Sequence, residues 1–302
     1  MILSLALSPS VDITYEVDAL VIGAIARPSR VTRVAGGKAL NMARVARELG
    51  ADTGVIAALG GGAGRWIADR LAEESLPVIV VPLTRETRTC IAIVESGEVS
   101  TGESSDSSTD IYETATPFAP GEWDAFAAAT LGSAVGSGDW VAVCGSLPSG
   151  VTVSNLVALL QQLRGRGVRI AVDASGEDLE MLALTTDLLK INLAEASGLL
   201  RRTPQSAVEA AQALHQIFRL RAVVTDSVRG AAACDAEGLT VLPPPMQRGR
   251  FPAGSGDAFL GGLLAGLDSG RAFADSLAAG STAAMHNALI PGQGRLAIAD
   301  RE

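Results

Sequence analysis

The segment WVAVCGSLPSGVTVSNLVALLQQLRGRGVRIAVDAS (140–175) decides the fold class. It begins with the apolar run WVAVCG, continues through a helical stretch at 153–166, and ends with the apolar run VRIAVDAS. Short apolar runs of this kind, bounded by turn residues, are typical of buried strands. The segment therefore predicts a strand–helix–strand unit, in which a helix connects two parallel strands.

The same alternation continues on both sides of this segment. The apolar runs DLLKIN (187–192) and RAVVTDS (221–227) predict two more strands, and residues 1–7 predict a first strand. Regular strand–helix alternation implies a doubly wound, mainly parallel sheet with helices on both faces. The expected helices lie at 38–50, 64–74, near 120–132, 153–166, 193–201, 204–216 and, as a pair of apolar helices, within 254–289.

Other regions interrupt this alternation. Residues 13–35 hold β-branched and apolar residues broken by Gly23 and Pro28, and predict short strands. The polar segment 102–118 predicts a surface loop or a strand crossover. Further strands are expected at 77–82, 89–94 and 97–101.

Composition narrows the class of protein. The chain has 302 residues, 48% of them apolar, which is enough for one large α/β domain spanning 1–302. A net charge of −9 argues against general binding to nucleic acid or to a membrane surface. No apolar run reaches the roughly 18 residues that a membrane-spanning helix needs.

Cysteine and histidine content points to a reduced, cytoplasmic setting. Cys90, Cys144 and Cys234 are scattered without CxxC spacing, which argues against a disulfide framework or a zinc site. With only His215 and His286 present, a histidine-rich metal site is excluded.

The strongest candidate for a chemical site is PAGSGDAFLGGLLAGL (252–267). Gly254, Ser255 and Gly256 lead into an acidic residue and then an apolar helix. Free backbone N–H groups at a helix start bind anions, and glycine lets the backbone approach them closely. Asp257 could then accept a proton from an attacking hydroxyl group. The alternative is a simple helix cap, because Asp is common at such positions.

A second GSGD string, at 136–139, serves as an internal control. It is followed by Trp140 and a predicted strand, so it has no helix amides with which to build an anion site.

Two familiar phosphate motifs are also missing. Gly37-Lys38 is not followed by Ser or Thr as in a P-loop, and Arg65 stands where a dinucleotide fingerprint needs its third glycine.

Lysine use gives an independent clue. Of the 24 basic residues only Lys38 and Lys190 are lysines, and both fall within motifs quoted below. A compact ammonium and a planar guanidinium are not interchangeable at a phosphate site. The placement favours a functional role for both lysines over a genome-wide preference for arginine codons.

Taken together, these motifs resemble those of the PfkB, or ribokinase-like, carbohydrate kinases over nearly the whole chain. AGGKALN (35–41) and AGSGD (253–257) look like the paired patterns of the family. CGSLPSGV (144–151) is similar to SGSLPPGV, and KINLAE (190–195) to KPNxxE. TDSVRGA (225–231) stands where the family has a TLGxxGA nucleotide loop. TRTCIAI (87–93) resembles the strand of the branch that phosphorylates hexose phosphates, which includes 1-phosphofructokinases and tagatose-6-phosphate kinases.

The resemblance implies a role for each matched residue. Asp257 would be the catalytic base, within the anion loop of Gly254, Ser255 and Gly256. On the acceptor side, sugar hydroxyls would contact Asp12, Gly37 and Asn41, and a sugar phosphate would pair with Arg88, Lys38 and Arg27. On the donor side, ATP would contact Lys190, Thr225, Ser227, Gly230, Gly254 and Gly256, and Mg²⁺ would be held, through water, by Asn192 and Glu195.

The resemblance also implies a ribokinase-like fold with a small β-sheet lid from about 9–35 and 88–112. Such a lid covers the sugar and often pairs between subunits, so a homodimer is expected. The sequence departs from the family pattern at Ala39, Cys144, Ile191, the TDS loop and Thr109–Tyr112. These departures affect the acceptor and nucleotide contacts more than the residues of phosphoryl transfer, and a buried core thiol is the expected role of Cys144.

Three hypotheses remain at this point. The first is a kinase of a hexose phosphate such as fructose 1-phosphate, fructose 6-phosphate or tagatose 6-phosphate. The second is a kinase of an unphosphorylated sugar or nucleoside, of the ribokinase, fructokinase or adenosine kinase type. The third is a non-catalytic sugar-phosphate-binding protein, against which the intact Asp257, Asn192 and Glu195 argue.

Overall fold

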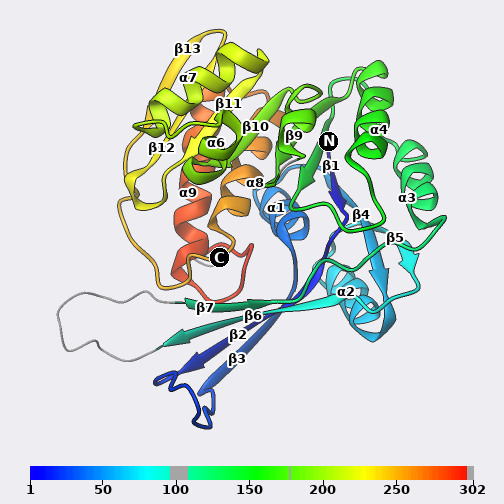
Figure 1. Ribbon diagram of the computed structural model, residues 1–302, viewed down its shortest axis with the longest axis vertical. Helices are drawn as coiled ribbons and strands as arrows, with labels where there is room; N and C mark the ends of the chain where they lie inside the picture. Colours follow the sequence, from blue (N-terminus) through cyan, green and yellow to red (C-terminus); the bar gives the residue numbers. More distant parts are fainter. Residues whose placement is uncertain (96–107, 177, 298–302) are drawn as a thin grey trace.

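A nine-stranded sheet forms the centre of the protein (Figure 1). The structure is a computed structural model, and it describes residues 1–95, 108–176 and 178–297. Its strands are, in spatial order, β13 (Gly238–Leu242), β12 (Ala231–Asp235), β11 (Arg221–Thr225), β10 (Leu188–Asn192), β9 (Arg169–Asp173), β8 (Trp140–Cys144), β1 (Ile2–Ala6), β4 (Thr53–Gly60) and β5 (Val78–Leu83).

The sheet is parallel from β11 to β5, as the strand–helix alternation predicts. The edge strands β12 and β13 are antiparallel, and the sequence did not predict them. Only Ala236 and Glu237 separate these two strands, which leaves room for a hairpin turn but not for the crossover helix of a parallel pair.

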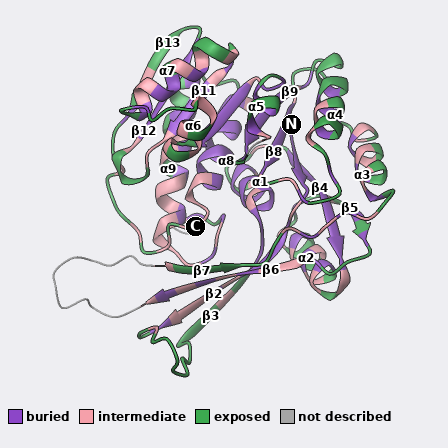
Figure 2. Ribbon diagram, in the orientation of Figure 1, coloured by how far each residue is buried: buried purple, intermediate pink, exposed green. Residues whose placement is uncertain are grey.

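Helices cover both faces of the large sheet and enclose two cores (Figure 2). Alternate strand residues point to opposite faces, so Leu3 and Leu5 enter one core while Ile2 and Ala6 enter the other. The first core is covered by α3 (Glu122–Leu131), α4 (Val153–Gly165), α5 (Leu179–Ala183), α6 (Leu193–Leu200) and α7 (Ala207–Phe218). The second is covered by α1 (Lys38–Glu48), α2 (Gly61–Glu73), α8 (Ser255–Asp268) and α9 (Phe273–Leu289).

A separate four-stranded sheet projects from the large one (Figure 1). Its order is β3 (Arg30–Gly36), β2 (Ser10–Val17), β6 (Arg88–Glu95) and β7 (Ser108–Tyr112). β7 occupies part of the segment expected to be a loop or crossover, because its backbone pairs with β6. The strand predicted at 97–101 lies outside the described residues.

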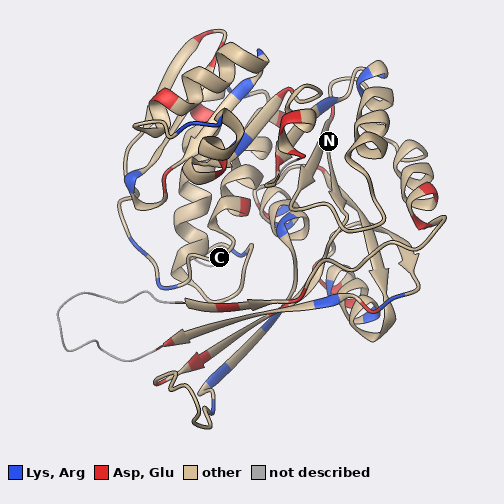
Figure 3. Cartoon of the chain, viewed as in Figure 1, with Lys and Arg blue, Asp and Glu red and all other residues tan. Residues whose placement is uncertain are grey.

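No helix in the described ranges combines the length and the apolar character that crossing a membrane requires. Acidic and basic residues occur on helices, on loops and on strands of the small sheet, whereas β1, β4, β5 and β8 of the large sheet carry none (Figure 3). The net charge of −9 is therefore distributed over the molecule and is not confined to one element.

Candidate active site

A cleft of about 810 Å³ lies where the small sheet meets the carboxyl ends of the parallel strands. This edge is where open α/β sheets bind ligands, because the loops after each strand converge there. All the site residues predicted from the sequence line this cleft except Asn41 and Arg27. Segments from the beginning, middle and end of the chain thus come together at one place.

The glycine-rich segment 254–256 forms the start of α8, with Gly254 as the N-cap and Ser255 and Gly256 as the first helical residues. Gly254 adopts a left-handed backbone with φ of 82°, which glycine tolerates and other residues rarely adopt. A Cβ atom at Gly256 would lie 3.0 Å from Nζ of Lys190, so this glycine leaves space for the lysine above the helix start. The amide end of α8 and an ammonium group therefore face the same part of the cleft, as an anion site requires.

Asp257 lies in the first turn of α8, and its side chain is almost fully buried, with 7% of the residue exposed. Its Oδ2 accepts a hydrogen bond of 2.9 Å from Nδ2 of Asn41, so Asn41 acts on the site through Asp257 although it does not line the cleft. Burial, followed by the negative charge of Asp173, raises the pKa of Asp257 to about 6 against the opposing effect of Lys38. A carboxylate of this kind is ionised at neutral pH yet basic enough to accept a proton.

Asp173 is the main site residue that the sequence prediction missed. It ends β9, is 2% exposed, and accepts hydrogen bonds from Lys190 Nζ at 2.6 Å and Lys38 Nζ at 3.4 Å. Burial alone would raise the pKa of Asp173, but the charges of Lys190 and Lys38 outweigh burial and hold the pKa below its ordinary value. The one available signal was an acidic residue at the carboxyl end of the apolar run VRIAVDAS.

The two lysines of the chain meet at this carboxylate. Lys190 is buried within β10, and Lys38 is the first residue of α1. The charge of Asp173, opposed by burial and reinforced by Asp257, keeps the pKa of Lys38 well above its ordinary value. Cys144 at the end of β8 borders the same cluster, and burial raises the pKa of its thiol, as expected for a core cysteine that stays protonated.

The small sheet contributes the other wall of the cleft. Asp12 on β2 is buried and accepts hydrogen bonds from the Ser10 hydroxyl at 2.5 Å and the Gly37 amide at 3.2 Å. Burial raises the pKa of Asp12, whereas these hydrogen bonds act in the opposite direction. A Cβ atom at Gly36 would overlap the Asp12 carboxylate, which explains why the AGGK motif needs a glycine there.

Arg88 begins β6 beside Asp12. Its guanidinium donates to the backbone carbonyls of Ser8 at 3.2 Å and Glu113 at 3.0 Å, which fixes its orientation in the cleft. Its Nε is buried and has no hydrogen-bond partner among the described residues. A guanidinium held in the cleft by two backbone carbonyls is suited to an anionic group such as a phosphate.

The loop after β11 forms a third side of the cleft. Thr225, Ser227 and Gly230 line it, and Ser227 has a left-handed φ of 51° that is uncommon outside glycine. The neighbouring Asp226 accepts two hydrogen bonds from Arg229, at 2.8 and 2.6 Å. The Asp of the TDS segment thus stabilises the loop, while Ser227 takes the conformation that suits a glycine.

Asn192 and Glu195 form a capping box at the start of α6. Oδ1 of Asn192 accepts the Glu195 amide, and Oε2 of Glu195 accepts the Asn192 amide, both at 2.9 Å. Both side chains also line the cleft, and oxygen donors of this type fit Mg²⁺ held through water. The described residues contain no group of three or more His, Cys, Asp or Glu side chains arranged to hold a metal directly.

Two remaining sequence features lie elsewhere. Arg27 occupies an exposed turn between β2 and β3, away from the cleft of its own chain.

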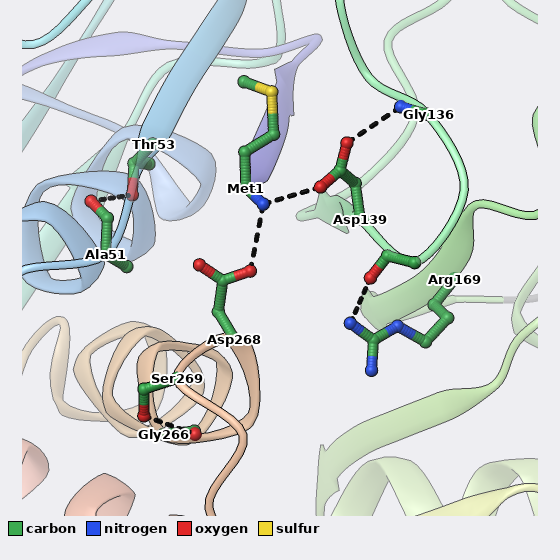
Figure 4. Close-up of polar contacts among 10 residues, drawn as sticks. Met1, Ala51, Thr53, Gly136, Asp139, Arg169, Gly266, Asp268 and Ser269 are labelled. Carbon is green, nitrogen blue, oxygen red and sulfur yellow. Dashed lines mark hydrogen bonds and ion pairs between the residues drawn. The ribbon is translucent and has the colours of Figure 1, made fainter.

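Asp139 of the second GSGD string accepts hydrogen bonds from the N-terminal amine of Met1 at 2.6 Å and the Gly136 amide at 2.8 Å (Figure 4). This copy therefore anchors the N-terminus, together with Asp268 at 3.0 Å from the same amine.

The chain is similar to known carbohydrate kinases in sequence and in fold. The profile of the pfkB family carbohydrate kinases matches residues 5–295. Tagatose-6-phosphate kinase of Staphylococcus epidermidis is 29% identical over 274 residues, covering 88% of this chain and 85% of that protein. Phosphofructokinase-2 from Escherichia coli, solved in complex with potassium, has a TM-score of 0.87 at 26% identity, covering 98% of this chain and 94% of that chain.

A possible 1-phosphofructokinase from Thermotoga maritima shares the fold, with a TM-score of 0.81 at 22% identity and coverage of 94% of this chain and 91% of that chain. Because the family profile matches nearly the whole sequence, the chain belongs to the pfkB family of carbohydrate kinases. It is a phosphotransferase with an alcohol group as acceptor, and its fold is the ribokinase-like α/β fold with a second, smaller sheet.

Proposed function

We propose that this protein transfers the γ-phosphoryl group of ATP to a hydroxyl group of a hexose phosphate. The observation that carries the proposal is the position of Asp257, a buried carboxylate at a glycine-rich helix start beside Lys38 and Lys190. Proton acceptor, helix amides and two ammonium groups are the components that phosphoryl transfer to an alcohol needs in one place.

In the proposed reaction, the acceptor hydroxyl oxygen attacks the γ-phosphorus of ATP. A new P–O bond forms, the bond from the γ-phosphorus to the β,γ-bridging oxygen breaks, and ADP leaves. The hydroxyl proton passes to Asp257. Lys38, Lys190 and the first amides of α8 balance the negative charge on the transferring group, which is the largest contribution that such a site makes.

The proposed acceptor follows from the wall formed by β2 and β6. Asp12 can accept hydrogen bonds from sugar hydroxyls, and Arg88 offers a held guanidinium to a phosphate already present on the sugar. The names of the relatives favour the same class, since one is a tagatose-6-phosphate kinase and another a phosphofructokinase. Arg27 stays a prediction for this phosphate, because within its own chain it lies away from the cleft.

Asn192 and Glu195 are the proposed holders of Mg²⁺, through water. The metal would neutralise charge on the ATP phosphates and help to orient them. Both residues are already fixed by their capping box, so their orientation needs no further ordering when the nucleotide binds.

We further propose that the protein is a homodimer that pairs through the small sheet. Successive residues of a strand point to opposite faces of a sheet, and one face of the small sheet lines the cleft. On its other face, Val31 is 42% exposed and Ile111 is 57% exposed. Exposed apolar residues on one sheet face are typical of a protein–protein contact.

The three cysteines are all free and buried, which is consistent with the proposed cytoplasmic location.

The test is an ADP-release assay with ATP and Mg²⁺ that compares fructose 1-phosphate, fructose 6-phosphate, tagatose 6-phosphate, fructose, ribose and adenosine. A hexose phosphate should give the highest kcat/KM. Asp257→Asn should lower kcat by about 100-fold or more, since general base catalysis contributes roughly 10²–10⁴, while leaving substrate binding largely intact.

Asp139→Asn is the matched control, because it changes the same residue type within an identical GSGD string far from the cleft. This control should keep the activity of the parent protein. A purified, folded Asp257→Asn variant with the parent's turnover would refute the assignment of the base. Preference for fructose, ribose or adenosine over every hexose phosphate would instead refute the proposed acceptor.

A further inference from the structure

Both lysines of the chain converge on a single buried carboxylate, that of Asp173. Lys190 comes from β10 and Lys38 from α1, so three elements contribute one charge each to this cluster. The side chain of Asp173 is 3% exposed and that of Lys190 5% exposed, whereas Lys38 reaches into the open cleft at 39%. With two cations on one anion, the cluster keeps a net positive charge toward the cleft.

The positions of the lysines depend on that carboxylate. Lys190 has a hydrogen bond to Asp173 and lies close to Gly256 in the anion loop. Among the described residues, the side chain of Lys38 makes one hydrogen bond, to the other oxygen of the Asp173 carboxylate. A lysine side chain has many rotamers, so a fixed partner decides where its ammonium group lies.

We infer that Asp173 is a positioning residue that holds Lys38 and Lys190 toward the transferring phosphoryl group. The inference rests on the proposed function, in which these ammonium groups balance the charge of that group. Asp173 acts through the lysines and does not itself need to touch the substrate. Its two oxygens are each occupied by one ammonium group, which separates the lysines and lets them contact different oxygens of a phosphate.

Asp173 also influences Asp257 through its charge. The groups around Asp257 are Lys38 and Asn41 from α1, Cys144 from β8, Asp173 from β9 and Lys190 from β10. Asp173 is the one neighbour in this set whose negative charge opposes ionisation of Asp257. Without that charge, burial alone would oppose the effect of the two lysines, so the pKa of Asp257 should fall and it should become a weaker base.

The experiment compares Asp173→Asn with the parent protein in kcat, kcat/KM and their dependence on pH. Asp173→Asn should lower kcat by about 100-fold, the order observed when one electrostatic contact to a developing charge is removed. The fall in kcat/KM on the acidic side, expected near pH 6 for the parent, should move to lower pH. A residue with a purely structural role would lower the amount of folded enzyme without moving this fall.

Asp173→Glu separates position from charge, and it also carries the test if Asp173→Asn does not fold. It keeps the negative charge but displaces both ammonium groups, so kcat should fall while the acidic fall stays near that of the parent. Asp187→Asn is the control, since Asp187 also pairs with a basic residue, Arg164, and accepts a backbone amide. Asp187 directly precedes β10 and so lies at the opposite end of the strands from the cleft. It should leave kcat and its pH dependence unchanged.

The inference is overturned if Asp173→Asn retains the parent's kcat, or if its kcat falls with no change in pH dependence. It is equally overturned if Asp173→Glu turns over substrate at the parent's rate. A parent protein that phosphorylates no hexose phosphate would contradict the proposed function itself, and this inference with it. The two failures are distinguishable, because the second is visible before any variant is made.

Discussion

The surroundings of Asp257, the proposed catalytic base, suit a proton acceptor but oppose the stability of the fold. Its pKa is raised from an ordinary 3.8 to about 6, first by burial and then by the charge of Asp173. A carboxyl group whose pKa is higher in the folded state binds a proton more readily there than in the unfolded chain. The folded state is therefore most stable when Asp257 is protonated, and it loses stability as the pH rises from about 4 to about 6.

Asp257→Asn should consequently be more stable than the parent protein at pH 8. The pKa difference corresponds to about 3 kcal/mol of unfolding free energy, because each unit is worth about 1.4 kcal/mol. Asn keeps an oxygen that can accept the hydrogen bond from Asn41, so the substitution removes mainly the buried charge. Thermal melting at pH 8 and at pH 4 measures the effect. The variant should melt higher at pH 8, the gap should close at pH 4, and a lower melting temperature at pH 8 would contradict the account.

At the start of α2, the glycine-rich backbone contacts the two residues that precede β6. Glu86 precedes β6 and accepts a hydrogen bond of 2.5 Å from the Ala63 amide at this helix start. Hydrogen bonds from backbone amides of Ala63 and Gly62 hold the pKa of Glu86 below its ordinary value. The Thr87 hydroxyl accepts the Gly60 amide at 2.9 Å. The GGGAGR segment (60–65), which did not fit a dinucleotide fingerprint, therefore starts a helix that binds a carboxylate of its own chain next to Arg88.

Gly61→Ala and Gly62→Ala form a matched pair that tests this contact. Gly61 has φ of +67°, and a Cβ atom there would overlap the Glu86 carboxylate, so Gly61→Ala should cost about 1–3 kcal/mol of unfolding free energy. A Cβ atom at Gly62 would lie 3.6 Å from Glu86, an ordinary contact, so Gly62→Ala should be neutral or stabilise by up to about 1 kcal/mol.

Because Arg88 follows Glu86 by two residues, Gly61→Ala should also raise KM for the hexose phosphate more than KM for ATP. Denaturant unfolding and steady-state kinetics measure the two effects. Equal stabilities for the two variants would show that the helix start does not depend on Glu86. An unchanged KM for the acceptor in Gly61→Ala would show that the contact has no influence on Arg88.

At the scale of the whole molecule, the features that were predictable from sequence are those encoded over short stretches. Strand–helix alternation predicted the parallel sheet, and the glycine loop with its helix predicted the setting of Asp257. Asp173 was missed because its meaning depends on Lys38, which is 135 residues away in sequence. A strand-terminal acid looks the same whether it faces solvent or two lysines. The hairpin of β12 and β13 was missed because its pairing is set by a turn between two small apolar strands.

The proposed homodimer would pair through the outer face of the small sheet. Asp12 on β2 and its neighbour Cys90 on β6 face the cleft, so the next residue pair, Ile13 and Ile91, faces away. Ile111 on β7 pairs with Ile91 and extends this apolar row to the exposed edge. A face of this kind suits a two-fold contact with a second copy of the same sheet.

Ile111→Asp should therefore convert a dimer into a monomer, because two buried and unpaired carboxylates would face each other across the contact. Val241→Asp is the matched control, since Val241 is also on an edge strand, β13, and is 58% exposed against 57% for Ile111. Sedimentation velocity at micromolar concentration should show a dimer for the parent and for Val241→Asp. A monomeric parent, or a dimeric Ile111→Asp variant, would exclude this face of the small sheet as the contact. Loss of the dimer in Val241→Asp would instead place the contact at the β13 edge of the large sheet.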